Sequence, residues 1–169
     1  MPSRPSASTA PLAGIFTETP MTVGSWWDDA DMVLEVGAHA LRSRRDGLCH
    51  SATLIENNGA DSATVCLLIF YAAECGLKER LIRRRGQRTT AALDSTHDLR
   101  RLAKELCLPR SVGQHLDRLR TCRLHPHTRG CVSVADLHQA WRYGAKLDST
   151  DEKEALAALR ALINWCTED

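Results

Sequence analysis

One apolar segment near the middle of the chain constrains the fold more than any other feature. Residues 61–85 predict a single long helix, and its first half, which includes Val65–Ala73, is apolar on nearly every face. Gly86 marks the end of this helix. Because a helix that is apolar all round must be covered by other elements, we expect this one to be the central, most buried helix of the protein.

The chain after residue 24 predicts further helices and no strand. Several segments open with a serine followed three residues later by Asp, Gln or Glu, which is typical of a capping box. We expect the first helix to end at Asp46-Gly47 and a turn at Asn57-Asn58-Gly59. The expected fold class is all-α, an up-and-down bundle of two long helices with shorter helices at one end. The predicted helices cover residues 27–44, 61–85, 96–107, 112–123, 134–143 and 150–166.

Length and composition predict one domain that follows a tail. A chain of 169 residues is long enough for a single domain with its own core. Residues 1–24 are rich in Pro, Ser, Thr and Ala and show no periodicity. We therefore expect a disordered N-terminal tail over residues 1–24 and one helical domain over residues 25–169.

The sequence also predicts where the protein works. It contains no run of about 20 apolar residues that could span a membrane, and its N-terminus lacks the apolar region of a signal peptide. Its seven cysteines have no disulfide-like spacing. Free thiols are typical of a reducing compartment, so we expect a cytoplasmic protein without membrane contact.

Positive charge is concentrated at the end of the predicted central helix. The net charge of the chain is only +1, so any attraction for nucleic acid has to come from a local patch. Arginine binds phosphate through a fork of N–H donors, which favours contact with RNA or a nucleotide. The alternative is favourable charge at a helix C-terminus. No aromatic residue lies in this run, which argues against stacking of single-stranded bases there. The run consists of Arg80, Arg83, Arg84, Arg85 and Arg88.

Two short pairs are interpreted as parts of the fold. Glu74 and Lys78 lie one helical turn apart, and we interpret them as an ion pair that fixes helix packing, with contact to a ligand as the alternative. His97-Asp98 is interpreted as the start of a helix rather than as a catalytic dyad. The tryptophans are expected in the core or at a dimer contact rather than as platforms for bases. They are Trp26, Trp27, Trp141 and Trp165.

The densest cluster of polar side chains is Cys122-x2-His125-x-His127-x3-Cys131. One interpretation is an active-site loop, in which a histidine moves protons and Arg120, one turn or less from the loop, binds a phosphate. A second interpretation is a Cys2His2 zinc site, although the spacing differs from the common pairs of zinc-binding cysteines. The third is a solvent-facing loop without a chemical role.

Three segments, in this order along the chain, resemble the HEPN family of small helical domains. Tyr71–Lys78 is similar to the family's second-helix segment, Thr96–Leu102 to the entry of its third helix, and Trp141–Tyr143 to the Arg-Tyr step near the start of its late helix. The resemblance covers residues 26–166 and implies two long antiparallel helices followed by shorter ones. It further implies a bacterial toxin–antitoxin or phage-defence protein that forms a homodimer, with a partner protein encoded nearby.

Catalytic members of the family are metal-independent endoribonucleases with an arginine four to six residues before a histidine, and no cofactor or metal is expected. On this basis we expect His125 as the general acid/base, Arg120 as the phosphate clamp and His127 as the alternate histidine. Contacts to RNA or a nucleotide are expected from Arg83, Arg84, Arg85, Arg88 and Arg142.

One departure from the family leaves enzymatic activity open. The family places its motif near the late helix, where this chain has Arg142–Lys146 and no histidine after it. Members without the motif are not expected to be nucleases. The alternative function is therefore a non-catalytic helical module that binds a partner protein.

Overall fold

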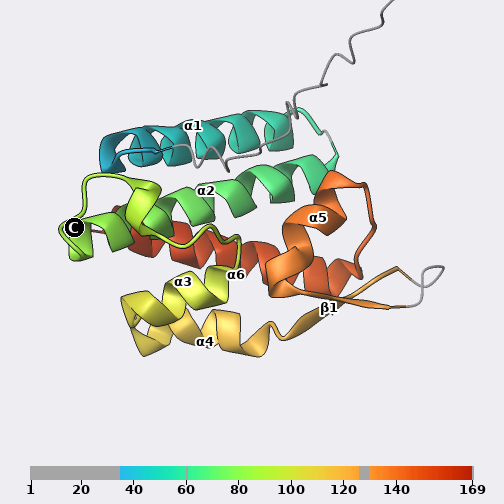
Figure 1. The fold of residues 1–169 in the computed structure, drawn as a ribbon. Coiled ribbons are helices and arrows are strands. Elements are labelled where there is room, and N and C mark those ends of the chain that lie inside the picture. Colours follow the sequence, from blue (N-terminus) through green and yellow to red (C-terminus); the bar gives the residue numbers. More distant parts are fainter. Residues whose placement is uncertain (1–34, 60, 126–129, 169) are drawn as a thin grey trace, which may run out of the picture. The chain divides into compact units, whose positions relative to one another are not determined.

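Three long helices form the main part of the fold (Figure 1). They are α1 (Ala38–Asn57), α2 (Ser62–Arg84) and α6 (Ser149–Thr167). The computed structural model describes residues 35–59, 61–125 and 130–168. The predicted tail of residues 1–24 and the predicted helix start at Trp27 lie outside the described residues.

The central helix α2 packs against both other long helices. A short turn joins α1 to α2, and the two run antiparallel (Figure 1). α6 runs in the same direction as α2, because Ser62 bonds Glu152 near their starts at 3.4 Å and Arg80 bonds the Cys166 carbonyl near their ends at 3.3 Å. The long connection over residues 85–148 returns the chain to the starting end of α2, so the three long helices do not alternate up and down throughout.

The prediction of a central, buried helix at residues 61–85 is confirmed. The Asp61 side chain caps its first turn, and Phe70 is completely enclosed in the core. Gly76 lies where α2 meets α6, and a Cβ atom there would lie 3.0 Å from the Cβ and Sγ atoms of Cys166. The glycine therefore lets the two helices approach closely.

The first helix differs from its prediction. We expected it to end at Asp46-Gly47, but α1 continues through this pair to Asn57. A glycine inside a helix costs about 1 kcal/mol relative to alanine, and burial of the neighbouring Leu48 in the core offsets this cost. The predicted turn after the helix is confirmed, with Gly59 at a φ of +68°.

Short elements connect α2 to α6. The predicted helix at residues 96–107 begins only at residue 99, and the one at residues 134–143 divides into a 3-10 turn and a short α-helix. None of the helices in the described part of the chain combines the length and the apolar character needed to cross a membrane. The short elements are η1 (Thr90–Ala92), α3 (Leu99–Leu106), α4 (Arg110–Arg118), β1 (Thr121–Arg123), β2 (Cys131–Ser133), η2 (Val134–Asp136) and α5 (Leu137–Arg142).

The expectation that the chain has no strand is wrong. We expected a helix over residues 112–123, but α4 ends at Arg118 and the following residues form β1, which pairs antiparallel with β2. Strands of three residues are too short to show the alternation by which a strand is predicted. The described chain is therefore mostly helical, with one short two-stranded sheet.

Carboxylates rather than serines cap two of the predicted helices. Asp98 accepts hydrogen bonds from two backbone N–H groups in the first turn of α3, and Asp148 does the same for α6. The predicted capping boxes began at Ser95 and Ser149 instead. An aspartate at this position also places negative charge at the positive end of the helix dipole.

A buried carboxylate joins the long helices. Glu79 on α2 is 1% exposed and pairs with Arg42 at 3.1 Å, Arg45 at 3.4 Å and Arg83 at 2.9 Å. Arg45 is itself buried, and it also donates to the Cys166 carbonyl at the end of α6 at 3.1 Å. This network, which we call the Glu79 cluster, connects α1, α2 and α6.

Two glycines inside long helices should respond oppositely to alanine. We expect Gly76→Ala to destabilise the protein by about 1–3 kcal/mol, because the added methyl group overlaps Cys166. At Gly47 no atom lies within 4 Å of an added Cβ, so Gly47→Ala should stabilise α1 by about 0.5–1 kcal/mol. Urea denaturation followed by circular dichroism measures both. Effects of the same sign would contradict the packing role of Gly76.

Loss of the Glu79 charge should destabilise the fold strongly. We expect Glu79→Gln to lower the free energy of unfolding by about 3 kcal/mol or more, because Arg45 then stays buried without this carboxylate. The matched control is Glu56→Gln, which breaks the exposed pair of Glu56 with Arg160 and should cost less than about 1 kcal/mol. Equal losses in chemical denaturation would show that the buried pair has no special weight.

Candidate functional site

The predicted basic run lies at the end of α2, and most of it makes contacts within the fold. Arg84 donates to the carbonyl groups that end α3, Arg85 pairs with Glu105, and Arg83 belongs to the Glu79 cluster. Arg88 is exposed. The arginines predicted to bind phosphate therefore also hold the ends of helices in place.

The predicted catalytic loop is not brought together as expected. Strand β1 separates Arg120 from His125, where a helix had been expected. His125 lines an open cavity of about 350 Å³, and its backbone N–H donates to the Lys146 carbonyl at 2.8 Å. The alternate histidine, His127, lies outside the described residues.

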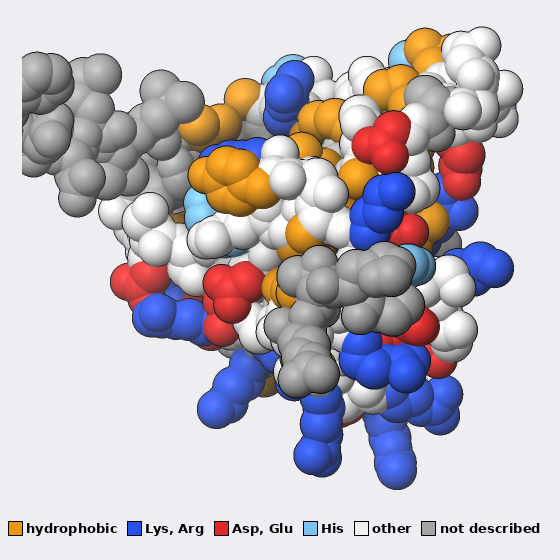
Figure 2. Space-filling model, turned by 90° about the vertical axis from the view of Figure 1, so that its right-hand side faces the viewer, with side chains coloured by type: hydrophobic (Ala, Val, Ile, Leu, Met, Phe, Trp, Pro, Cys, Tyr) orange, Lys and Arg blue, Asp and Glu red, His pale blue; other side chains and the backbone are white. Residues whose placement is uncertain are grey.

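Arg120 is exposed and lies between α4 and β1. Figure 2 looks at the end of the molecule that carries α5 and the hairpin, and Lys and Arg side chains project along its lower edge, on the side where α4 lies. Arg118, Arg120 and Arg123, which lie from the end of α4 into β1, are exposed. Arg123 pairs with Asp148 at 3.1 Å and Asp151 at 3.0 Å, whereas the other two make no ion pair with any described residue.

The zinc interpretation meets a geometric obstacle. In the hairpin Cys122 lies opposite Val132, and Cys131 lies opposite Arg123. Successive positions along a strand point to opposite faces, so the two thiols do not converge on one ion. Burial also raises the pKa of Cys122 to about 11, which opposes its use as a thiolate. Among residues 35–59, 61–125 and 130–168, no group of three or more His, Cys, Asp or Glu side chains is arranged to hold a metal ion.

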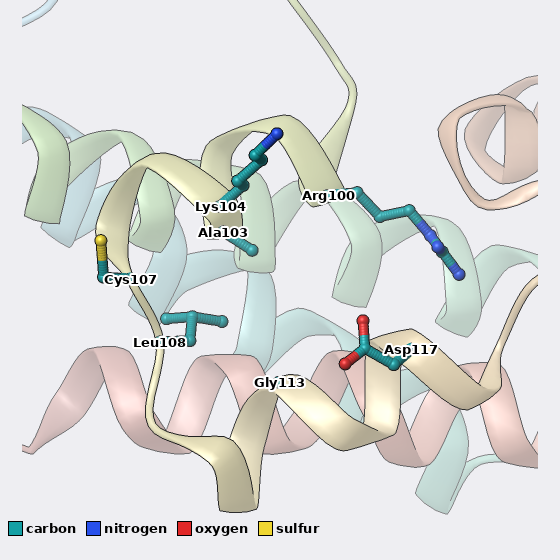
Figure 3. A pocket seen from close by; sticks show the side chains of 7 residues that line it. All are labelled: Arg100, Ala103, Lys104, Cys107, Leu108, Gly113 and Asp117. Carbon is teal, nitrogen blue, oxygen red and sulfur yellow. The ribbon is translucent and has the colours of Figure 1, made fainter.

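A hollow of about 380 Å³ lies between α3 and α4 (Figure 3). Arg100 and Asp117 face each other at one end of it, and Cys107 and Leu108 lie at the other. Arg100 donates through Nη2 to the Leu116 carbonyl at 2.6 Å. Its guanidinium therefore holds the end of α4, and the hollow offers no further cation with a comparable fixed position.

A different group of ionisable side chains is brought together by three segments of the chain. α2 supplies the carboxylate, the segment before α3 supplies one histidine, and α5 supplies a second histidine and an arginine. We call this group the histidine cluster. It consists of Glu74, His97 and His138, with Tyr71, Lys78 and Arg142 around them.

Glu74 orients His97. The carboxylate is 7% exposed, and its Oε2 lies 2.9 Å from Nδ1 of His97, while Oε1 accepts from Nζ of Lys78 at 2.7 Å. The predicted Glu74–Lys78 ion pair is thus confirmed. Because the carboxylate accepts, Nδ1 of His97 carries the hydrogen in this contact and Nε2 is the nitrogen left for another partner. The His97 side chain is 54% exposed, so this nitrogen is accessible from solvent.

His138 packs against His97 from the protein side. The two ring centroids are 4.8 Å apart and the planes are inclined by 33°. Nδ1 of His138 donates to the Ala135 carbonyl at 2.9 Å, and the Phe70 ring lies 5.2 Å away. Burial lowers the pKa of His138 below its ordinary 6.5, and the nearby charge of His97 adds to this effect. His138 is therefore a neutral ring at pH 7 that fixes the plane of its neighbour.

Arg142 places a positive charge beside the two imidazoles. It follows His138 by one turn of α5, which puts both side chains on the same face of the helix. Its Nη2 lies 2.5 Å from the hydroxyl oxygen of Tyr71, whose ring lies 6.5 Å from that of His97. The guanidinium remains exposed. The cluster thus combines an accessible, oriented imidazole with a cation that can bind an anion, which suits proton transfer next to a phosphate.

Sequence reasoning identified the parts of this cluster but not their assembly. Glu74 and His97 were interpreted as elements of the fold, and the hydrogen bond between them leaves no trace in sequence spacing. Asp98 does start a helix, as expected, while its neighbour His97 turns to Glu74. His138 was not singled out, although its spacing from Arg142 within a predicted helix was a usable signal.

Comparison of the chain with protein-family models, with curated proteins and with solved structures gave no match. The HEPN resemblance therefore remains a prediction that depends on the three sequence segments described above. The function has to be argued from the chemistry of the histidine cluster itself.

His138 should make stability depend on pH. Its pKa is lower in the folded than in the unfolded protein, so the unfolded state binds the proton first and the free energy of unfolding falls as pH drops below about 6.5. The fall ends once pH passes below the lowered, folded pKa. Chemical denaturation between pH 8 and pH 5 measures this profile.

His138→Gln should flatten that part of the profile. His115→Gln, which changes an exposed histidine of α4, is the matched control and should leave its shape unchanged. A profile that is the same in His138→Gln and in the unaltered protein would contradict the assignment.

Proposed function

We propose that the chain is a HEPN-like helical protein of a bacterial defence or toxin–antitoxin system that binds RNA and cleaves it, without a metal ion, at the histidine cluster. The observation that carries this proposal is the accessible imidazole of His97, hydrogen-bonded to the buried Glu74 and stacked on His138 beside Arg142. The family is expected to combine an acid–base group with a cation that binds phosphate. In this proposal His97 and Arg142 fill these roles, in place of His125 and Arg120.

The proposed reaction uses the 2′-hydroxyl of RNA as nucleophile. Nε2 of His97 takes the 2′-hydroxyl proton as the 2′-oxygen attacks phosphorus. The bond from phosphorus to O5′ breaks, and O5′ takes a proton from water, which leaves a 2′,3′-cyclic phosphate and a 5′-hydroxyl. Arg142 binds the phosphate oxygens, on which negative charge develops. Glu74 and His138 are positioning residues that hold His97.

The position of the three HEPN-like segments supports this proposal. Tyr71–Lys78, Thr96–Leu102 and Trp141–Tyr143 all contribute to the histidine cluster, through the Tyr71–Arg142 and Glu74–His97 contacts. Ionisable groups that separate segments bring together around an accessible side chain mark a candidate functional site, and here that side chain is His97. The homodimer and the partner protein encoded nearby belong to the same proposal.

The alternative function is a non-catalytic module that binds a partner protein. The observation that favours it is Tyr143, which is 78% exposed and follows Arg142 directly. Tyrosine and arginine are both enriched at the contact surfaces of proteins.

Cleavage of a labelled single-stranded RNA by the purified protein in EDTA tests the proposal. We expect His97→Ala to lower kcat/KM by at least roughly 100-fold, because it removes the acid–base group, and Arg142→Gln to lower it by a similar order. Melting temperatures of both variants are measured as well, because His97 also bonds the buried Glu74 and Arg142 bonds Tyr71. Replacing the 2′-hydroxyl at the scissile position by hydrogen should abolish cleavage.

The matched controls are His125→Ala and Arg120→Ala, which should retain kcat/KM within about threefold. If these controls lost activity and His97→Ala kept it, the active site would lie at the hairpin and the proposal for the histidine cluster would be wrong. Absence of cleavage in every form, together with a stable complex with a co-encoded protein, would favour the alternative function.

A further inference from the structure

A second basic site lies where the ends of α2 and α6 meet. An open hollow of about 370 Å³ is lined there by Arg80, Arg83 and Arg84 of α2, Leu106 of α3 and Trp165 of α6. This volume is at the lower end of the range that is typical of ligand pockets, about 300–1,000 Å³. It therefore has room for a small ligand rather than for a protein surface.

The fold brings an aromatic side chain into the arginine run. The sequence showed no aromatic residue among these arginines, but Trp165 reaches them from α6. The guanidinium carbon of Arg80 lies 5.3 Å from the centre of the Trp165 ring. Arg80 is fixed in this place because it donates to the Trp165 and Cys166 carbonyls at 3.2 and 3.3 Å. The two side chains form a prearranged cation–π pair.

The charge of the hollow is positive and only partly neutralised. Among the residues that the structure describes, no carboxylate lines it, and Glu79, the ion-pair partner of Arg83, is buried and shared with Arg42 and Arg45. Arg83 is about half exposed and pairs with Glu79 through Nε at 2.9 Å. Arg84 donates to neutral carbonyl groups and a thiol, so its charge is not paired.

We propose that this hollow binds one nucleotide of single-stranded RNA, with its base against the Arg80–Trp165 pair and its phosphate on Arg83 and Arg84. Bases stack on aromatic rings and on guanidinium planes, and arginine forks bind phosphate. The proposal depends on the proposed function for the class of ligand, and it adds a binding site apart from the histidine cluster. Nine residues of α2 separate Glu74 from Arg83, which is about 13 Å along the helix.

Fluorescence anisotropy with a labelled single-stranded RNA hexamer tests the site, with His97→Ala in every protein so that no cleavage interferes. We expect Trp165→Leu and Arg83→Gln each to raise Kd roughly tenfold. Trp165→Phe, which keeps an aromatic ring, should stay within about threefold. Arg83→Lys keeps a positive charge beside the buried Glu79 but loses the fork of donors, so it tests the phosphate contact without unpairing that carboxylate and should also raise Kd.

The control is Arg160→Gln, which removes an arginine of an exposed ion pair outside the hollow and should leave Kd unchanged. An unchanged Kd in both Trp165→Leu and Arg83→Gln would overturn the proposal, as would equal affinity for an RNA duplex. Binding of an acidic peptide instead of RNA would also overturn it.

The two proposals fail separately. Cleavage that depends on His97, with a Kd that does not respond to Trp165→Leu or Arg83→Gln, would refute only this site. Binding that depends on Trp165 and Arg83, with no cleavage by the protein that retains His97, would support this site and refute the ribonuclease activity alone.

Discussion

The fold depends on how the buried charge of Glu79 is neutralised. A carboxylate that is 1% exposed would cost several kcal/mol without partners. Its three guanidinium partners come from α1 and α2, and one of them, Arg45, extends to the last carbonyls of α6. The charge of Glu79 is therefore neutralised by α1 and α2, and Arg45 links this pair of helices to α6 through the Cys166 carbonyl. Gly76 contributes the close approach of α2 to α6 that brings Arg45 within reach of α6.

Guanidinium groups that donate to backbone carbonyls, as Arg45 does at α6, also occur at the ends of other helices. Arg80 holds the C-terminus of α6, Arg84 that of α3 and Arg100 that of α4, each by donating to carbonyl groups that lack a partner within their own helix. One guanidinium can serve two carbonyls, whereas a lysine offers a single nitrogen. The planar fork of donors is therefore suited to these three positions. The sequence suggested that the arginine run places favourable positive charge at the C-terminus of its own helix, α2. Arg80 and Arg84 place it instead at the C-termini of the neighbouring helices α6 and α3.

How much of the fold and of the candidate site the sequence predicts depends on how far apart in the chain the interacting residues lie. The extents of α2 and α6 and the Glu74–Lys78 pair depend on neighbours within a helix, so periodicity and spacing were sufficient. The continuation of α1 through Gly47 depends on packing with α2, and the three-residue strands carry no measurable alternation. The histidine cluster could not be predicted, because its Glu74–His97 contact joins separate elements. The arginine run alone also gave no sign of Trp165, which lies about 80 residues later in the chain and reaches the same hollow.

The two proposed RNA contacts share one rigid support. Glu74 and Arg83 lie on the same helix, and the Glu79 cluster, which fixes that helix against its neighbours, lies between them. An RNA chain bound at both sites would therefore pass His97 at a constant distance from the base that is bound at Trp165. Cleavage would then occur at a fixed number of nucleotides from the bound base, whatever the sequence between them, since stacking and phosphate contacts read no base edges. A weakened Glu79 cluster would therefore make the number of nucleotides between the bound base and the cleaved bond less uniform, before it removed the contact at His97 or at Trp165.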